Sequence, residues 1–404
     1  MANYFDTKNN PRKAYSGLLL ILAIALVFPF IAQNFGNSWV RIMDFALLYI
    51  MLALGLNVVV GFAGLLDLGY IAFYAIGAYL TALLASPQFA VVLESFVNQY
   101  PAIGETLLWV FGPEIAQNGI HLSLWAIVPL AALVAGFFGA LLGAPTLKLR
   151  GDYLAIVTLG FGEIIRIFMN NLNGPVNITN GPQGINMIDP IRIFGVSLNG
   201  EAGSRATVMI GDYAMPSVNA YYFLFLFLCI AIIFISVRLQ NSRLGRAFVA
   251  IREDEIAAKA MGINTRNVKL LAFAMGASFG GIAGAMFASF QGFVSPESFS
   301  LTESIAVLAM VVLGGMGHIP GVVLGGIILA ALPEILRHVV EPLQQSLFGE
   351  VLIDAEVLRQ LLYGLAMVLI MLYRPAGLWP SPKSEDRPTA DNDTAKKSTD
   401  VVAV

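Results

Sequence analysis

Long apolar runs recur along the whole chain, and they limit its possible folds more than any other feature. A helix that crosses a bilayer needs about 20 mainly apolar residues, and 57% of this sequence is hydrophobic while 12% is charged. The runs cover residues 14–32, 42–60, 66–85, 122–142, 153–169, 221–237, 268–291, 304–316, 322–336 and 358–373. They predict an all-α, polytopic transmembrane helical bundle of about ten spans, in which several helices are short or broken by glycine.

The positions of Lys and Arg predict how this bundle is oriented. Most of the 23 basic residues lie in four segments, namely 1–13, 148–150, 238–269 and the part beyond residue 373, whereas the connection 86–121 has none. Cytoplasmic loops carry the excess of basic residues. We therefore expect a cytoplasmic N-terminus over 1–13, a membrane domain over 14–380 and a disordered cytoplasmic tail over 381–404. Residues 171–220 then form a long connection on the outer side.

The segment 238–269 is the most charge-dense part of the predicted membrane domain. Asp254 is placed to cap a short helix over 255–261 that ends at Gly262, and Thr265 to cap the next helix. This segment suits docking to a soluble partner, or it is an ordinary cytoplasmic loop whose basic residues only set the topology. The candidate contact residues are Arg252, Asp254, Glu255, Ala257, Ala258, Lys259 and Gly262.

Glycines combined with polar residues interrupt two of the apolar runs. Such breaks permit half-helices around a passage, although glycines also allow helices to pack closely. The candidate translocation residues are Gly61, Gly64, Asp67 and Gly69 in the first break and Gly314, Gly315 and His318 in the second. Asp67 is also placed to cap the helix that follows it. Elsewhere, Glu163 and Arg166 stand three residues apart and are predicted to pair with each other.

No motif for catalysis is found in the sequence. It lacks GxxxxGK[ST], HExxH and a nucleophile elbow in a strand–helix setting, it has a single cysteine, Cys229, and its three histidines are far apart. We therefore predict no catalytic residue, no metal and no cofactor. The net charge of −3 gives no indication of a nucleic-acid partner. Any energy from ATP must come from another polypeptide.

Four stretches together resemble the permease subunits of bacterial branched-chain amino acid ABC importers. They read GLNVVVGFAGLLDLGYIAFYAIGAYLTALL, LRGDYLAIVTLGFGEIIRI with TNGPQGI, GRAFVAIREDEIAAKAMGIN, and ESIAVLAMVVLGGMGHIPGVVLGG. The resemblance covers residues 42–380 and implies that 255–262 is a coupling segment that docks on an ATPase. Ile256 occupies the first of two positions where other importer permeases have alanine, and Ala257 and Ala258 follow.

The resemblance also implies the partners and the location of the chain. The partners are two ATP-binding subunits, a second homologous permease, a periplasmic substrate-binding protein and membrane lipid, and 171–220 becomes a periplasmic connection in the bacterial inner membrane. The expected function is inward movement of branched-chain amino acids by alternating access. The alternatives are a urea or short-amide importer permease, an ion-coupled secondary transporter with an intramembrane cation site, and a passive channel.

Overall fold

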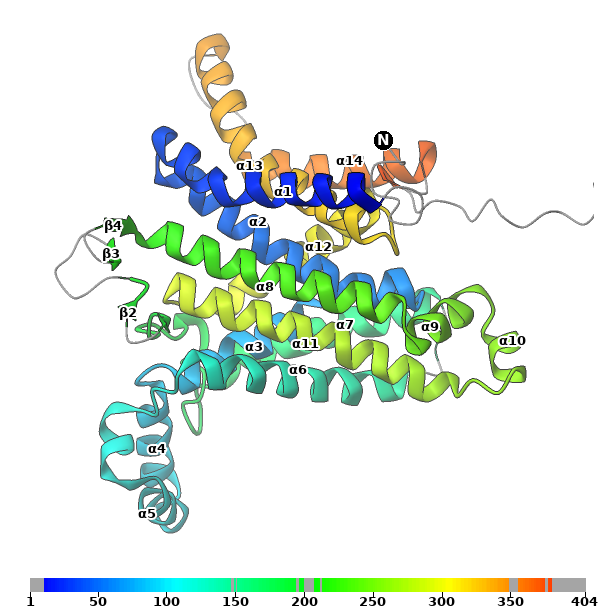
Figure 1. Ribbon diagram of the computed structural model, residues 1–404. Coiled ribbons are helices and arrows are strands. Elements are labelled where there is room, and N and C mark those ends of the chain that lie inside the picture. The colour runs from blue at the N-terminus through cyan, green and yellow to red at the C-terminus, as the bar shows by residue number, and fades with distance from the viewer. Residues whose placement is uncertain are drawn as a thin grey trace, which may run out of the picture.

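In a computed structural model the chain forms a single helical bundle with small appendages at both ends (Figure 1). The structure describes residues 11–146, 149, 151–193, 196–199, 207–210, 213–348, 355–374 and 377–379. Residues 1–10 of the predicted N-terminal segment and the predicted tail 381–404 therefore lie outside the described residues.

Each of the ten apolar runs contains a helix, so the predicted all-α bundle is confirmed. Six helices are long and apolar enough to span a membrane, or up to seven if α3 and α4, bent by 80°, count as one. Within the described ranges, length and composition therefore support six or seven spans, fewer than the ten predicted. The bundle helices are α1 (Pro11–Ala32), α2 (Asn37–Leu56) continuing as the π-helix η3 (Asn57–Phe62), α3 (Ile71–Leu84), α6 (Leu124–Thr146), α7 (Asp152–Asn171), α8 (Ser217–Gln240), α11 (Thr265–Gln291), α12 (Leu301–Gly314), α13 (Ile319–Phe348) and α14 (Ala355–Tyr373).

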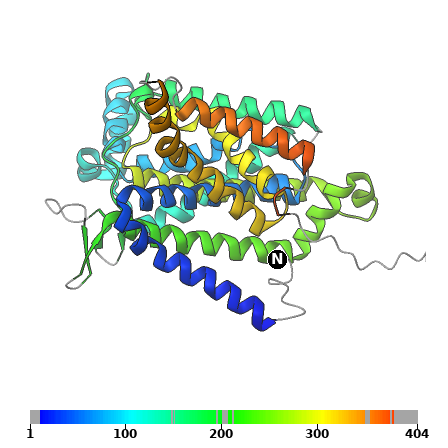
Figure 2. The same ribbon diagram turned by 90° about the horizontal axis from the view of Figure 1, so that it is seen from above.

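The centre of the bundle is formed by α2 and α11, whose membrane-length stretches are 89% and 67% buried. In Figure 2 the blue α2 runs between the green α8 and the gold α13, both of which pack on it. Small residues allow the close approach, because Gly276 packs on the backbone of Gly55 and Gly284 packs on the carbonyl group of Tyr74. An added methyl group at either glycine would overlap the facing helix. The glycine steps in α11 therefore serve helix packing.

Two short helices each follow an irregular segment. The first segment is the predicted break between η3 and α3, and the other lies between α11 and α12 and contains the 3₁₀ turn η5 (Pro296–Phe299). Helix α3 packs on α11, α6 and α7, and α12 packs on α2, α13 and α14. The second predicted break, with Gly314, Gly315 and His318, lies between α12 and α13. Both α3 and α12 have 14 residues, which gives about 21 Å of helix. Helix α3 is therefore too short to cross a bilayer alone, whereas α12 continues from η5, and the stretch Pro296–Gly314 is one of the six candidate spans.

The appendages lie at opposite ends of the bundle (Figure 1). One end carries α9 (Arg243–Glu253) and α10 (Glu255–Ala260). The other carries α4 (Gln88–Gln99), α5 (Pro101–Asn118) and two antiparallel hairpins, β1 (Arg192–Ile193) with β2 (Val196–Ser197) and β3 (Thr207–Ile210) with β4 (Tyr213–Pro216). Two further 3₁₀ turns are η2 (Gln33–Phe35) and η4 (Gly181–Gln183). The segment 238–269 and the two long connections, 86–121 and 171–220, thus lie at opposite ends of the bundle. That these ends face different sides of a membrane stays a prediction.

Candidate coupling and translocation site

The predicted short helix in the charged segment is present as α10. The Asp254 carboxylate accepts hydrogen bonds from the amide N–H groups of Ile256 at 2.8 Å and Ala257 at 3.1 Å. Gly262 follows the helix with φ +84°, a conformation that glycine adopts without strain. Both ends of α10 therefore follow from local sequence, as predicted.

The predicted cap of the next helix was wrong by one residue. The Asn264 side chain, rather than Thr265, accepts the hydrogen bond from the Asn267 amide at 3.2 Å, and Thr265 is the first residue of α11. Asparagine is at least as good an N-cap residue as threonine, and here it comes first along the chain.

The outward face of α10 is apolar as well as charged. Ile256 is 69% exposed and Met261 is 83% exposed, while Ala258 on the opposite face is 4% exposed. Large apolar side chains at such exposure are typical of a surface that a partner protein covers. Ala257, Lys259 and Gly262 are also exposed and belong to the same short helix and its end.

An ion pair attaches α10 to the centre of the bundle. The Lys269 Nζ atom lies 2.7 Å from the Glu255 Oε1 atom, and the Lys269 side chain is 5% exposed. The sequence placed Glu255 one turn from Lys259, but the contact in the structure reaches across to α11. The ion pair therefore joins α10 to α11, one of the two central helices.

A second connection leads from α9 to the two helix breaks. The Arg252 guanidinium donates a hydrogen bond to the Gly61 carbonyl oxygen at the end of η3. The Gly317 amide donates to the Asn57 side chain at 2.8 Å, and an added methyl group at Gly61 would overlap both. We call Asn57, Gly61, Arg252 and Gly317 the Arg252 cluster. It joins both breaks to the charged segment.

The other residues predicted in the first break pack closely against neighbouring helices. Gly64 has φ +69° and lies against the Arg252 side chain. Gly69 lies against the backbone carbonyl of Thr158 on α7, with no room for a methyl group. Asp67 accepts from the Gly69 amide at 2.9 Å, and its other carboxylate oxygen is buried without a partner among the described residues. Asp67 therefore closes a turn before α3, whose N-cap residue is Tyr70 and which has no side-chain cap hydrogen bond, so the prediction that Asp67 caps this helix was wrong.

The residues predicted in the second break are also packed together. Gly314 contacts the backbone of Gly321, and Gly315 has φ +117°. The His318 ring lies 6.1 Å from the Trp379 ring, and burial lowers the pKa of His318 below its usual value of 6.5. The structure therefore brings the two breaks together through Gly61 and Gly317. Whether these residues line a pathway stays a prediction.

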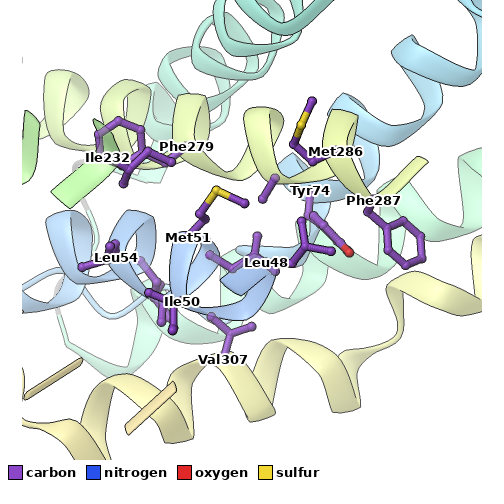
Figure 3. Close-up of a cluster of buried hydrophobic side chains, with 14 of the residues drawn as sticks. Leu48, Ile50, Met51, Leu54, Tyr74, Ile232, Phe279, Met286, Phe287 and Val307 are labelled. Carbon is purple, nitrogen blue, oxygen red and sulfur yellow. The ribbon is translucent and has the colours of Figure 1, made fainter. Parts of the chain in front are cut away.

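A cavity of about 200 Å³ lies in the bundle interior, away from the glycines of the breaks. It is lined by Phe45, Leu48 and Tyr49 of α2, Tyr74 of α3, Phe287 of α11, Ser298 of η5 and Glu303 of α12. Figure 3 shows Leu48, Tyr74 and Phe287 converging from three helices. Sequence reasoning did not single out this site, although an acidic residue inside an apolar run, Glu303, was a signal for it.

Glu163 and Arg166 of α7 form an ion pair. The Arg166 Nε atom lies 2.9 Å from Glu163, as predicted, and the guanidinium also lies 3.3 Å from Glu297 of η5. Among the described residues, no group of three or more His, Cys, Asp or Glu side chains is placed to hold a metal ion.

Membrane-length helices, two broken helices and an interior cavity together define a membrane transport protein. The family described as "Branched-chain amino acid transport system / permease component" matches residues 38–371. The chain therefore belongs to this family of membrane permeases.

Several permeases of known designation are similar to the chain. The high-affinity branched-chain amino acid transport system permease protein LivM of Escherichia coli K12 is 39% identical over 91% of this chain and 75% of that protein. A probable LivM of Methanocaldococcus jannaschii is 27% identical over 82% of this chain and 90% of that protein. The permease LivH of Escherichia coli K12 is 24% identical over 70% of this chain and 79% of that protein. No solved structure matches the chain significantly.

Proposed function

We propose that this permease carries branched-chain amino acids inward across a bacterial inner membrane, as the transmembrane subunit of an ATP-driven importer that works by alternating access. The family match over residues 38–371 carries this proposal. The names of the similar LivM proteins favour leucine, isoleucine and valine over urea or short amides as substrates.

The energy comes from two ATP-binding subunits, one of which docks on α10. The contact surface consists of the exposed Ile256, Lys259 and Met261, with Arg252, Asp254, Ala257 and Gly262 beside it. A capped helix with apolar exposed side chains supports this role, because it offers a partner a rigid, preformed surface. Ala258 faces the bundle and Glu255 pairs with Lys269, so these two residues orient α10.

Two connections transmit the movement of the ATPases into the membrane. The Glu255–Lys269 ion pair moves α11, and the hydrogen bond from Arg252 to Gly61 moves the end of α2 and the Arg252 cluster. Both central helices are thereby linked to the docking surface. The predicted translocation residues Gly61, Gly64, Asp67, Gly69, Gly314, Gly315 and His318 lie at the breaks that these connections reach.

The partners in the membrane and outside it follow from the importer type. LivM and LivH of the same bacterium are both similar to the chain, which supports a second, homologous permease beside it. A periplasmic substrate-binding protein would dock at the end with α4, α5 and the β-hairpins. On this orientation, a reporter placed after Gln99 or Asn199 reports the periplasm, and one placed after Lys259 or Ser384 reports the cytoplasm.

The substrate is tested by competition in whole cells. A bacterial strain without its own branched-chain amino acid importers is supplied with the chain and its partner proteins, and uptake of labelled leucine is measured. We expect isoleucine and valine to compete and urea to have no effect. Uptake of labelled urea in place of leucine would overturn the proposed substrate and support the short-amide alternative.

A further inference from the structure

The interior cavity combines apolar walls with a single charged group. Phe45, Leu48 and Phe287 provide aromatic and aliphatic surface, while Glu303 provides the one carboxylate among the lining residues. An ionisable side chain inside a membrane bundle is expected to have a function, because a charge in hydrocarbon costs at least a few kcal/mol. Ligand sites commonly have this composition, with mainly apolar walls and few polar groups.

Glu303 is held in place but keeps capacity for a further donor. One carboxylate oxygen accepts a hydrogen bond from the Tyr49 hydroxyl at 2.7 Å, and the other lies 3.8 Å from the Arg359 guanidinium. A carboxylate has about four acceptor positions, so an ammonium group in the cavity can still be accepted. Tyr74 lines the same cavity and carries a hydroxyl group that can donate a hydrogen bond.

A stripe along α2 leads to this carboxylate. Arg41, Phe45 and Tyr49 are spaced four residues apart and so share one face of the helix. Arg41 is exposed near the start of α2, donates to the Gln291 side chain at 2.9 Å, and lies 5.9 Å from the centre of the Phe45 ring. The stripe thus runs from an exposed cation near the helix end, past an aromatic ring, to the hydroxyl that holds Glu303.

The charge pattern fits a zwitterion better than a free cation. Glu303 already lies near Arg359, so the lining has little net charge to offer a lone cation. A zwitterion brings both charges and no net charge, which avoids placing an uncompensated ion in a low-dielectric interior. A metal cation would need several oxygen ligands, and the lining contains only one carboxylate.

We propose that this cavity is an amino-acid binding site, in which Glu303 holds the α-ammonium group and Phe45, Leu48 and Phe287 contact the aliphatic side chain. The carboxylate of the ligand lies toward the Tyr74 hydroxyl. This inference rests on the proposed function and deepens it, because it assigns substrate recognition to a site apart from the glycine breaks.

The cavity can be probed with a single introduced thiol. Cys229 is the only cysteine of the chain, so Cys229→Ala gives a background without thiols. Ser298→Cys then places a thiol in the lining, and Ser95→Cys on α4 serves as the control outside it. The purified complex is treated with aminoethyl methanethiosulfonate, with and without millimolar L-leucine. We expect leucine to slow the labelling at position 298 severalfold and to leave position 95 unchanged.

Two further arms test the role of the ammonium group. Isocaproate has the carbon skeleton of leucine without the α-amino group and should give no protection. Glu303→Gln, combined with Ser298→Cys, retains the acceptor for Tyr49 but loses the charge, and should abolish protection by leucine. Two results would overturn the assignment of Glu303. One is equal protection of position 298 by leucine and by isocaproate, and the other is protection by leucine that is the same with Glu303→Gln as without it.

Uptake separates this inference from the proposed function. Glu303→Gln should raise the KM for leucine at least severalfold while the complex is still recovered from the membrane. Glu297→Gln, a change at a carboxylate outside the cavity whose side chain is 71% exposed, should leave the KM and the complex yield unchanged. If the unaltered complex does not transport leucine, the proposed function fails. If it transports leucine but the two glutamate variants behave alike and position 298 is never protected, only the cavity assignment fails.

Discussion

Replacing Arg252 with methionine removes the guanidinium group that joins α9 to the end of α2. The methionine side chain keeps most of the apolar stem, and α9 stays anchored by Phe248 and Ile251, which are 0% and 5% exposed. The perturbation is therefore restricted to the hydrogen bond that Arg252 donates to the Gly61 carbonyl. Because Gly61 is buried, its carbonyl oxygen cannot turn to solvent for a replacement.

The size of the effect follows from this bond. A hydrogen bond from a charged donor contributes about 1.5–3 kcal/mol, and about 1.4 kcal/mol is a factor of ten in an equilibrium constant. We expect local opening of α9 and of η3 to become at least about tenfold more frequent. The matched control is Arg246→Met on the same helix, because Arg246 donates to the exposed carbonyl of Asn241 at 3.3 Å. In Arg246→Met we expect the frequency of local opening of α9 to change by about threefold or less.

Hydrogen exchange measured by mass spectrometry checks both values. Peptides covering 57–62 and 243–253 should exchange faster in Arg252→Met than in Arg246→Met. Fewer leucine molecules should also be transported per ATP hydrolysed, since the connection to α2 is weakened. Equal exchange and equal coupling in the two variants would refute the idea that Arg252 connects the charged segment to the helix break.

Three other predictions concern single residues. Gly262→Val places a β-branched residue at φ +84°, where the strain is about 1–2 kcal/mol, so substrate-stimulated ATPase activity should fall; undiminished stimulation would contradict the role of this helix end. Gly69→Ala overlaps the backbone of α7 and should reduce the yield of detergent-extracted complex, whereas Gly160→Ala on α7 has open space and should not; equal yields would contradict the packing role. Hydrogen bonding to Asp189 raises the pKa of His121 above its usual 6.5, so their ion pair is fully formed below that pH and is lost as pH rises through the raised pKa. Proteolysis at this end should accelerate at alkaline pH, and His121→Gln, which cannot be charged, should remove the pH dependence.

Local patterns predicted the parts of the structure that depend on few neighbouring residues. The apolar runs located all ten bundle helices, and Asp254 and Gly262 marked both ends of α10. The start of α11 was misjudged by one position because Asn264 and Thr265 are adjacent residues that both favour the N-cap. Helices α4 and α5 were not expected, and within α5 Gly112 and Pro113 interrupt the regular pattern.

Contacts between distant segments could not be predicted from the sequence. Glu255 and Lys259 stand four residues apart in α10, but spacing along the chain could not show that Glu255 pairs with Lys269 of α11. The glycines of the breaks indicated open space, whereas most of them allow backbones to touch. The cavity beside Glu303 depends on residues from α2, α3, α11 and α12, which only the packed bundle brings together.

Leucine uptake into proteoliposomes tests the account most directly. The chain is reconstituted with the second permease and the two ATP-binding subunits, with ATP enclosed on the side of the ATP-binding subunits and the substrate-binding protein with labelled leucine on the other. We predict accumulation that requires both ATP and the binding protein. Accumulation driven by a sodium or proton gradient, without the ATP-binding subunits, would contradict the central claim.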